Sequence, residues 1–118
     1  MNADVKTKWV AALRSGDYRQ GRMALHGEDD TFCCLGVLCE IAVTDIGLGV
    51  TKDPNYNKFE YGPTASGSLL PDLVVAWAGL EGETGANVEI NRRTTSLAQH
   101  NDTGRTFAQI ADAIEAQL

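Results

Sequence analysis

The longest apolar run of the chain, FCCLGVLCEIAV, extends from Phe32 to Val43. On a helix its apolar side chains cover nearly the whole circumference, which is typical of a central core helix rather than an amphipathic surface helix. We therefore predict a buried helix over residues 33–43. Gly36 lies inside it, where glycine costs roughly 1 kcal/mol relative to alanine, and this predicts the close approach of another backbone.

Two further stretches carry an apolar stripe at helical spacing, one near each end of the chain. The first follows Asn2, a good N-cap, and stops at Ser15 and Gly16. The last follows Thr106, which forms a capping box with Gln109. The stripe residues are Val5, Trp9 and Leu13 in the first helix, and Phe107, Ile110, Ala111 and Ile114 in the last.

Turn residues and short alternating stretches predict the remaining elements. A short helix begins at Pro71 and ends at Gly79, and Thr94-Thr95-Ser96 begins another that continues through Gln99. Residues 18–32 alternate loosely between polar and apolar and predict a β-hairpin whose second strand leads into the central helix. Residues 50–67 are rich in turn residues, with Tyr56, Phe59 and Tyr61 interleaved, and form either short edge strands or a long loop.

These elements predict a compact single domain, residues 1–118, of the α+β class. About four helices surround the buried central helix 33–43, together with one or two small antiparallel hairpins. A chain of 118 residues with 43% hydrophobic residues is long enough to bury one core.

The net charge narrows the range of partners. A formal charge of −6 argues against general nucleic-acid binding and against binding to an anionic membrane surface, since both need a cationic footprint. No apolar run approaches the roughly 18 residues of a membrane span, and we expect no secretory signal in the N-terminal residues. Three cysteines within one apolar run do not form a disulfide framework, and we expect a reducing, cytosolic compartment.

Cysteine chemistry has one candidate constellation. Cys33 lies where a helix begins, a position that lowers a thiol pKa, and His100 and Asp102 could complete a Cys-His-Asp arrangement. An apolar setting has the opposite effect on the thiol, and the cysteines are the types that fill cores. We therefore assign no catalytic residue and keep this constellation as an alternative. The cysteine spacing is not that of a zinc site, and we expect no metal or cofactor.

The strongest ligand candidate is residues 91–94. Asn91, Arg92, Arg93 and Thr94 contain a basic doublet that precedes a hydroxyl-rich helix start, where free backbone N–H groups and arginine side chains could hold a phosphate. The competing interpretation is a threonine N-cap beside two solvated arginines.

A second ligand candidate lies on the first predicted strand. Tyr18, Gln20 and Arg22 alternate along it and share one face, and these side chains suit a base and a phosphate. An exposed polar strand face explains the same pattern. The turn Asn101-Asp102-Thr103-Gly104 reads as a connection between helices, with Asp102 as a less favoured ligand contact.

Five segments, in this order, resemble a widespread group of small accessory proteins of tailed bacteriophages and prophages. The segments are residues 9–16, 18–21, 33–39, 70–80 and 97–111, and the most specific of them is CCLGVLC. The resemblance covers nearly the whole chain and implies a phage origin and a host-cytoplasm setting, without transferring catalytic residues. It also implies an action on host machinery or host defence, either by binding a host protein or by sequestering or degrading a nucleotide signal.

Three functional hypotheses follow. The first is a non-catalytic binder that sequesters a small phosphorylated, nucleotide-type metabolite of host defence signalling. The alternative is an inhibitor that binds a host protein through the loop 50–67, and the second alternative is a cysteine-dependent hydrolase or transferase. Assembly into a homo-oligomer is a general expectation for a small domain.

Overall fold

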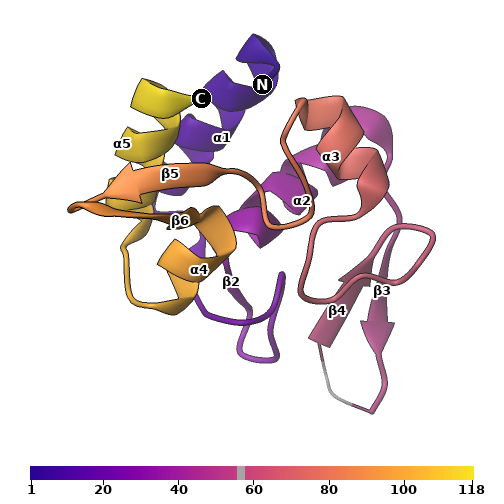
Figure 1. Cartoon of the computed structure of the whole chain (residues 1–118). Coiled ribbons are helices and arrows are strands. Elements are labelled where there is room, and N and C mark those ends of the chain that lie inside the picture. The colour runs from indigo at the N-terminus through magenta and orange to yellow at the C-terminus, as the bar shows by residue number, and fades with distance from the viewer. Residues whose placement is uncertain (56–57) are drawn as a thin grey trace.

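The central apolar run forms helix α2 (Cys34–Ile46) in a computed structural model that describes residues 1–55 and 58–118 (Figure 1). Residues 33–39 and 42 are buried and residues 40, 41 and 43 are half-buried, which confirms the buried helix predicted for residues 33–43. It ends at Gly47, whose φ of 67° is left-handed. A Cβ atom at Gly36 would overlap the backbone carbonyl of Leu25, so the predicted backbone approach is also confirmed.

Helices α1 (Ala3–Arg14) and α5 (Phe107–Gln117) pack against each other and form one side of the molecule (Figure 1). Both predicted caps are present, since Asn2 accepts from the Val5 N–H and α5 begins with the Thr106–Gln109 capping box. The indole of Trp9 donates to the carbonyl of Cys34 at 2.9 Å and so ties α1 to the central helix.

Two short helices complete the set around α2. Helix α3 (Asp72–Ala78) begins one residue later than predicted, because Pro71 is its N-cap, and it ends at the left-handed Gly79. Helix α4 (Leu97–Asp102) is capped by the side chain of Ser96, which accepts from the Gln99 N–H at 3.1 Å. Four helices therefore surround the central one within the described residues, as the sequence predicts.

The predicted hairpin over residues 18–32 is wrong. Strands β1 (Arg19–Gln20) and β2 (Thr31–Phe32) pair in parallel. Parallel strands need a crossover instead of a tight turn, and the intervening residues supply it. Two of them, Met23 and Asp30, adopt positive φ values of 64° and 57°.

The two other strand pairs are antiparallel hairpins, which confirms the α+β class. Strands β3 (Val50–Asp53) and β4 (Lys58–Tyr61) are the short-strand alternative for residues 50–67, and the predicted loop residue Tyr56 lies outside the described part of the chain. Strands β5 (Asn87–Ile90) and β6 (Arg93–Ser96) form the second hairpin.

The turn between β5 and β6 overturns the helix start predicted at Thr94. Asn91 and Arg92 have φ values of 50° and 68°, and two such residues between antiparallel strands make a type I′ turn. The next residues, Arg93 to Ser96, continue as strand β6. The hydroxyl-rich segment is therefore mostly strand, and α4 begins only after Ser96.

The described elements form one compact body. Its Cα radius of gyration is 13.0 Å. A single domain of about 100 residues typically has a radius of gyration of about 13 Å. Among the described helices, none combines the length and the apolar character needed to cross a membrane.

Candidate functional site

Two side-chain amides meet at the N-terminus of α2. Asn101 from α4 accepts, through Oδ1, the backbone N–H of Cys34 at 3.1 Å and the side-chain amide of Gln20 at 3.0 Å. Its Nδ2 donates to the carbonyl of Gly21 at 2.9 Å. Gln20 also donates to the carbonyl of Arg105 and accepts from the N–H of Phe107. The predicted ligand residue Gln20 therefore uses its amide to join β1 to α4 and α5, and Asn101 extends the network to α2.

A small polar hollow of about 160 Å³ opens beside this amide pair. Its lining residues are Gln20, Arg22, Asn101, Gly104 and Arg105. The Arg22 guanidinium lies over Gly104, where an added Cβ atom would stand 3.4 Å from it. Within residues 1–55 and 58–118, the side chains of Arg22 and Arg105 form no hydrogen bond or ion pair with another residue. Two arginines thus flank a hollow that contains no carboxylate.

Arg22 also lines a second, larger hollow of about 530 Å³. The other residues around it are Ala24, Gly27, Glu28, Asp29, Thr31, Asn55 and Lys58. This volume falls within the range of about 300–1,000 Å³ of small-molecule sites, although the lining is mainly polar and open to solvent. Arg22 is the residue that the two hollows share.

The candidates from the sequence do not all come together. Tyr18 is half-buried and packs edge-on against Phe32, with ring centroids 5.1 Å apart. Burial and nearby carboxylates raise the pKa of its hydroxyl. Among Tyr18, Gln20 and Arg22, only Arg22 is exposed and has a polar side chain that bonds no other residue in the described part of the chain.

The segment 91–94 lies at the exposed end of the β5–β6 hairpin, which extends along one side of the molecule (Figure 1). Asn91 lines a different hollow, whose walls include the carboxylates of Glu89 and Asp112. Arg92, Arg93 and Thr94 are exposed. The helix N-terminus that suggested a phosphate site is absent from this segment, because the backbone there forms the turn and β6.

The alternative cysteine constellation lies in the core. Burial raises the pKa of Cys33 to about 11 and raises the pKa of Cys34 well above its ordinary value. The His100 ring is fully buried, and its Nε2 donates to the carbonyl of Val88 at 2.8 Å. Asp102 accepts the N–H of Met23. These thiols stay protonated near neutral pH, a state that opposes a nucleophilic role.

A buried histidine cluster, which the sequence does not indicate, joins the β3–β4 hairpin to the core. The His26 ring stacks between Phe32 and Phe59, with both centroid distances at 4.1 Å. Its Nε2 contacts the carboxylate of Asp30, and the hydroxyl of Tyr61 donates to Glu40 at 2.7 Å. The cluster is packed and hydrogen-bonded, and its rings leave no open face for a ligand.

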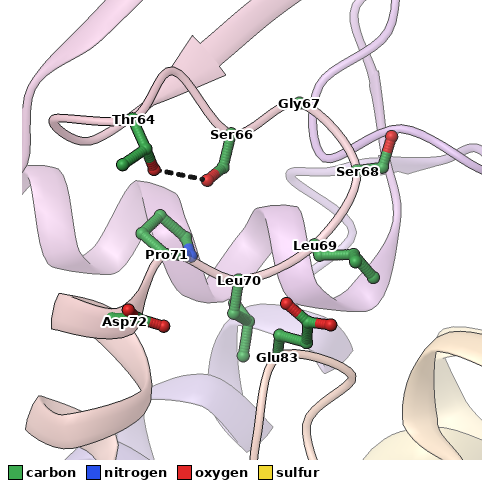
Figure 2. Close-up of a pocket in the computed structure, with 9 residues that line it drawn as sticks. All are labelled: Thr64, Ser66, Gly67, Ser68, Leu69, Leu70, Pro71, Asp72 and Glu83. Atoms are coloured by element: carbon green, nitrogen blue, oxygen red, sulfur yellow. Dashed lines mark hydrogen bonds between the residues drawn. The ribbon is translucent and has the colours of Figure 1, made fainter.

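A fourth depression, of about 360 Å³, follows strand β4 (Figure 2). Figure 2 shows the Thr64 and Ser66 hydroxyls facing each other at one end and the carboxylates of Asp72 and Glu83 at the other. No lysine or arginine lines it. Its charge therefore suits a cationic or neutral group rather than a phosphate. Elsewhere in the described chain, no three His, Cys, Asp or Glu side chains gather as a metal site would require.

Arg105 is the site residue that sequence analysis misses. It follows the turn at Gly104 and precedes the cap of α5, a position without any periodic relation to Arg22. The fold brings the two together because Gln20 binds both the carbonyl of Arg105 and the first N–H of α5. The glycine before Arg105 is the one local sign, since it leaves room for the Arg22 side chain.

Comparison with known proteins gives one match. A family model described as Domain of unknown function (DUF8296) matches residues 1–118. No curated protein and no solved structure matches the chain significantly.

Proposed function

The chain belongs to the DUF8296 family over its whole length, and we propose that it is a non-catalytic binder of a small phosphorylated, nucleotide-type metabolite. The ligand binds at Arg22, with its phosphate in the small hollow and the rest of the molecule in the large one. This proposal keeps Arg22 from the sequence candidates and adds Arg105.

The observation that carries the proposal is the pair of guanidinium groups around one carboxylate-free hollow. Arginine presents a planar set of donors that matches a phosphate in bidentate fashion, and its charge strengthens each hydrogen bond. Elsewhere on this acidic protein, Arg14 shows the usual arrangement, because it forms ion pairs with Asp112 and Glu115. Arg22 and Arg105 have no such partner among the described residues.

Sequestration needs no reactive group. A protein that buries a phosphorylated signal lowers the free concentration of that signal by mass action, without turnover. The protonated state of the core thiols agrees with this mode of action. Following the resemblance to accessory proteins of tailed phages, we place this action in the host cytoplasm during infection, with a defence signal as the ligand.

Two matched double variants test the location of the site. Arg22→Ala/Arg105→Ala and Arg92→Ala/Arg93→Ala each remove two positive charges, so their general electrostatic effects are equal. Isothermal titration calorimetry with the four ribonucleoside monophosphates measures the affinity of each protein. We expect the first variant to lose at least about tenfold, because a hydrogen bond to a charged group contributes about 1.5–3 kcal/mol. The second should bind as the wild type does.

If only Arg92→Ala/Arg93→Ala loses affinity, the ligand binds at the β5–β6 hairpin, as the sequence alone suggests. Equal affinity of the wild type and the Arg22→Ala/Arg105→Ala variant refutes the site proposed here. If the wild-type protein binds none of the four monophosphates, the proposed function itself is refuted.

A second candidate function rests on the β3–β4 hairpin, which extends away from the helices (Figure 1). Its outer strand exposes Val50, Thr51 and Lys52, and the apolar residue Val50 is 40% exposed. These features suit the docking of residues 50–67 on a host protein. A chain shortened at the hairpin tip should then lose capture of that protein in a pull-down from host lysate and keep its nucleotide affinity. Capture that survives the deletion excludes this mode.

A further inference from the structure

We infer that the surface at the start of α3 is a docking site for a protein segment that presents an arginine between aliphatic side chains. This α3 surface consists of Leu69, Asp72, Leu73 and Glu83, together with the depression that follows strand β4. Its depression shares no lining residue with the two hollows at Arg22, so the inference is independent of the proposed function.

The chain around the α3 surface is acidic. Residues 59–91 contain five of the 16 acidic residues and none of the ten lysines and arginines or the two histidines. Asp72 and Glu83 are both exposed, and in the part of the chain that the structure describes neither carboxylate forms an ion pair. Two such carboxylates beside one depression attract a cationic side chain.

One cation, Lys58, lies at the edge of this region. Its ammonium would stand 3.4 Å from an added Cβ atom at Gly67, and Figure 2 shows Gly67 away from the carboxylates of Asp72 and Glu83. The Lys58 side chain lines the large hollow at Arg22 rather than the depression beside α3. The two carboxylates therefore face a depression that has no basic residue in its lining.

Two leucines supply the apolar part of the α3 surface. Leu69 is 38% exposed and Leu73 is 50% exposed, whereas Leu70 between them is buried. Exposed apolar side chains with a polar rim are typical of interaction sites. A partner side chain that covers both leucines removes apolar surface from water, which favours association.

Backbone hydrogen bonds fix the walls of the depression. Tyr61 and Ser66 exchange two of them, at 2.7 and 2.8 Å, and the Leu70 N–H donates to the carbonyl of Glu83 at 2.9 Å. The buried side chain of Leu70 anchors the same segment in the core. A site that is already formed loses little conformational entropy when a partner binds.

An arginine suits this surface better than a lysine. Its guanidinium presents five donors in a planar fork, and ionised carboxylates only accept hydrogen bonds. The hydroxyls of Thr64 and Ser66, which line the same depression, supply further acceptors. The aliphatic stem of an arginine can lie along Leu69 while its charged end stays beside the polar groups. Aliphatic neighbours of the arginine then cover Leu73.

An NMR titration of the isotope-labelled intact chain tests the docking with three capped pentapeptides. Acetyl-Leu-Arg-Leu-Arg-Leu-amide has both proposed features, acetyl-Leu-Glu-Leu-Glu-Leu-amide reverses the charge, and acetyl-Ser-Arg-Ser-Arg-Ser-amide lacks the aliphatic side chains. We expect the first to shift the amide resonances of residues 64–73 and 83, and to bind at least about threefold more tightly than either control.

Three outcomes of this titration overturn the inference. Absence of shifts with the leucine-arginine peptide excludes the docking, and shifts confined to other residues place the peptide elsewhere. Equal affinity for the serine-arginine peptide means that the acidic chain attracts positive charge without using the leucines. None of these outcomes depends on whether the chain binds nucleotides.

A matched pair of charge variants tests the carboxylates. Asp72→Asn/Glu83→Gln should lower the affinity for the leucine-arginine peptide at least about threefold, because it removes both proposed ion pairs. The control Asp17→Asn/Glu28→Gln removes two exposed carboxylates from other loops, so it changes the net charge equally and should leave the affinity unchanged. An equal loss in both variants assigns the binding to overall charge and overturns the inference.

A second pair of variants tests the leucines. Leu73→Ser should lower the affinity for the same peptide at least about threefold, since it removes apolar contact area. Met23→Ser is the control, because Met23 is an apolar residue that is 76% exposed on another loop. Unchanged affinity in Leu73→Ser, with the rest of the NMR spectrum as in the wild type, overturns the proposed apolar contact.

Discussion

Asn101 and Cys34 are separated by 67 residues, yet the side-chain oxygen of Asn101 accepts the first backbone N–H of the central helix at 3.1 Å. The helix has no cap from its own N-cap residue, since the Cys33 side chain forms no capping bond. A residue from α4 therefore supplies an acceptor for one of the N–H groups that the helix leaves free, whereas a serine or aspartate at the N-cap would accept a later N–H of the first turn. The stability of α2 depends on the correct docking of α4.

Replacement of Asn101 by alanine should destabilise the fold by more than about 2 kcal/mol, because it leaves several buried polar groups without a partner. Urea unfolding followed by circular dichroism measures the loss. Asn87→Ala, at an exposed position of β5, is the control and should change stability by less than about 0.5 kcal/mol. If both variants are equally stable, the amide pair is not what holds α2 and α4 together.

The sequence predicts those elements whose signals are local. The continuous apolar run identifies α2, and the caps at Asn2 and Thr106, with the stripes that follow them, identify α1 and α5. Each of these depends on residues only a few positions apart. Such short-range patterns also fix the class of the fold, since the helices surround the apolar run that must be buried.

Three predictions from the sequence differ from the structure, one for a local reason and two for tertiary reasons. The sequence gives no signal for the β5–β6 turn, because Asn91-Arg92 lacks the glycine that usually follows asparagine in a type I′ turn. Parallel pairing of β1 and β2 depends on a crossover that alternation of side chains does not reveal. The contact between Gln20 and Asn101 joins residues from separate elements, so an amide that fills a structural role resembled a ligand contact in the sequence.

Replacement of Gly36 by alanine tests the tightest backbone approach in α2. Alanine would gain roughly 1 kcal/mol of helix propensity, but its Cβ would overlap the carbonyl of Leu25, which is fully buried. Overpacking of this kind costs about 1–3 kcal/mol, so we expect a net loss of stability in thermal unfolding. Gly49→Ala is the matched control, since no atom lies within 4 Å of its added Cβ. A Gly36→Ala protein that is more stable than the wild type contradicts the packing described here.

Replacement of Phe59 by alanine removes one face of the stack around His26. The rings of Phe59 and His26 are stacked with their centroids 4.1 Å apart, and this contact joins β4 to the loop before β2. We expect a loss of about 1–2 kcal/mol, together with faster hydrogen exchange in residues 58–61 than in α1 or α5. The change should be local because the hairpin is attached through this stack. Lys52→Ala, which removes only the cation 5.8 Å from the same ring, should leave the exchange rates nearly unchanged. Uniform acceleration throughout the chain would show that the hairpin opens only with global unfolding.

The buried cysteines predict how stability depends on alkaline pH. Burial raises the pKa of Cys33 from its ordinary 9.0 to about 11, so the folded protein keeps this proton after the unfolded chain has lost it. The unfolded state then binds fewer protons between these values, and stability falls as pH rises from about 9 to about 11. Below pH 9 the contribution of the thiol is fully present. Urea unfolding across this interval should show a shallower loss for Cys33→Ala than for the wild type, whereas identical slopes would mean that this thiol ionises as freely in the fold as in the unfolded chain. Alkylation should agree, since iodoacetamide at about pH 8 should label the cysteines only after denaturation.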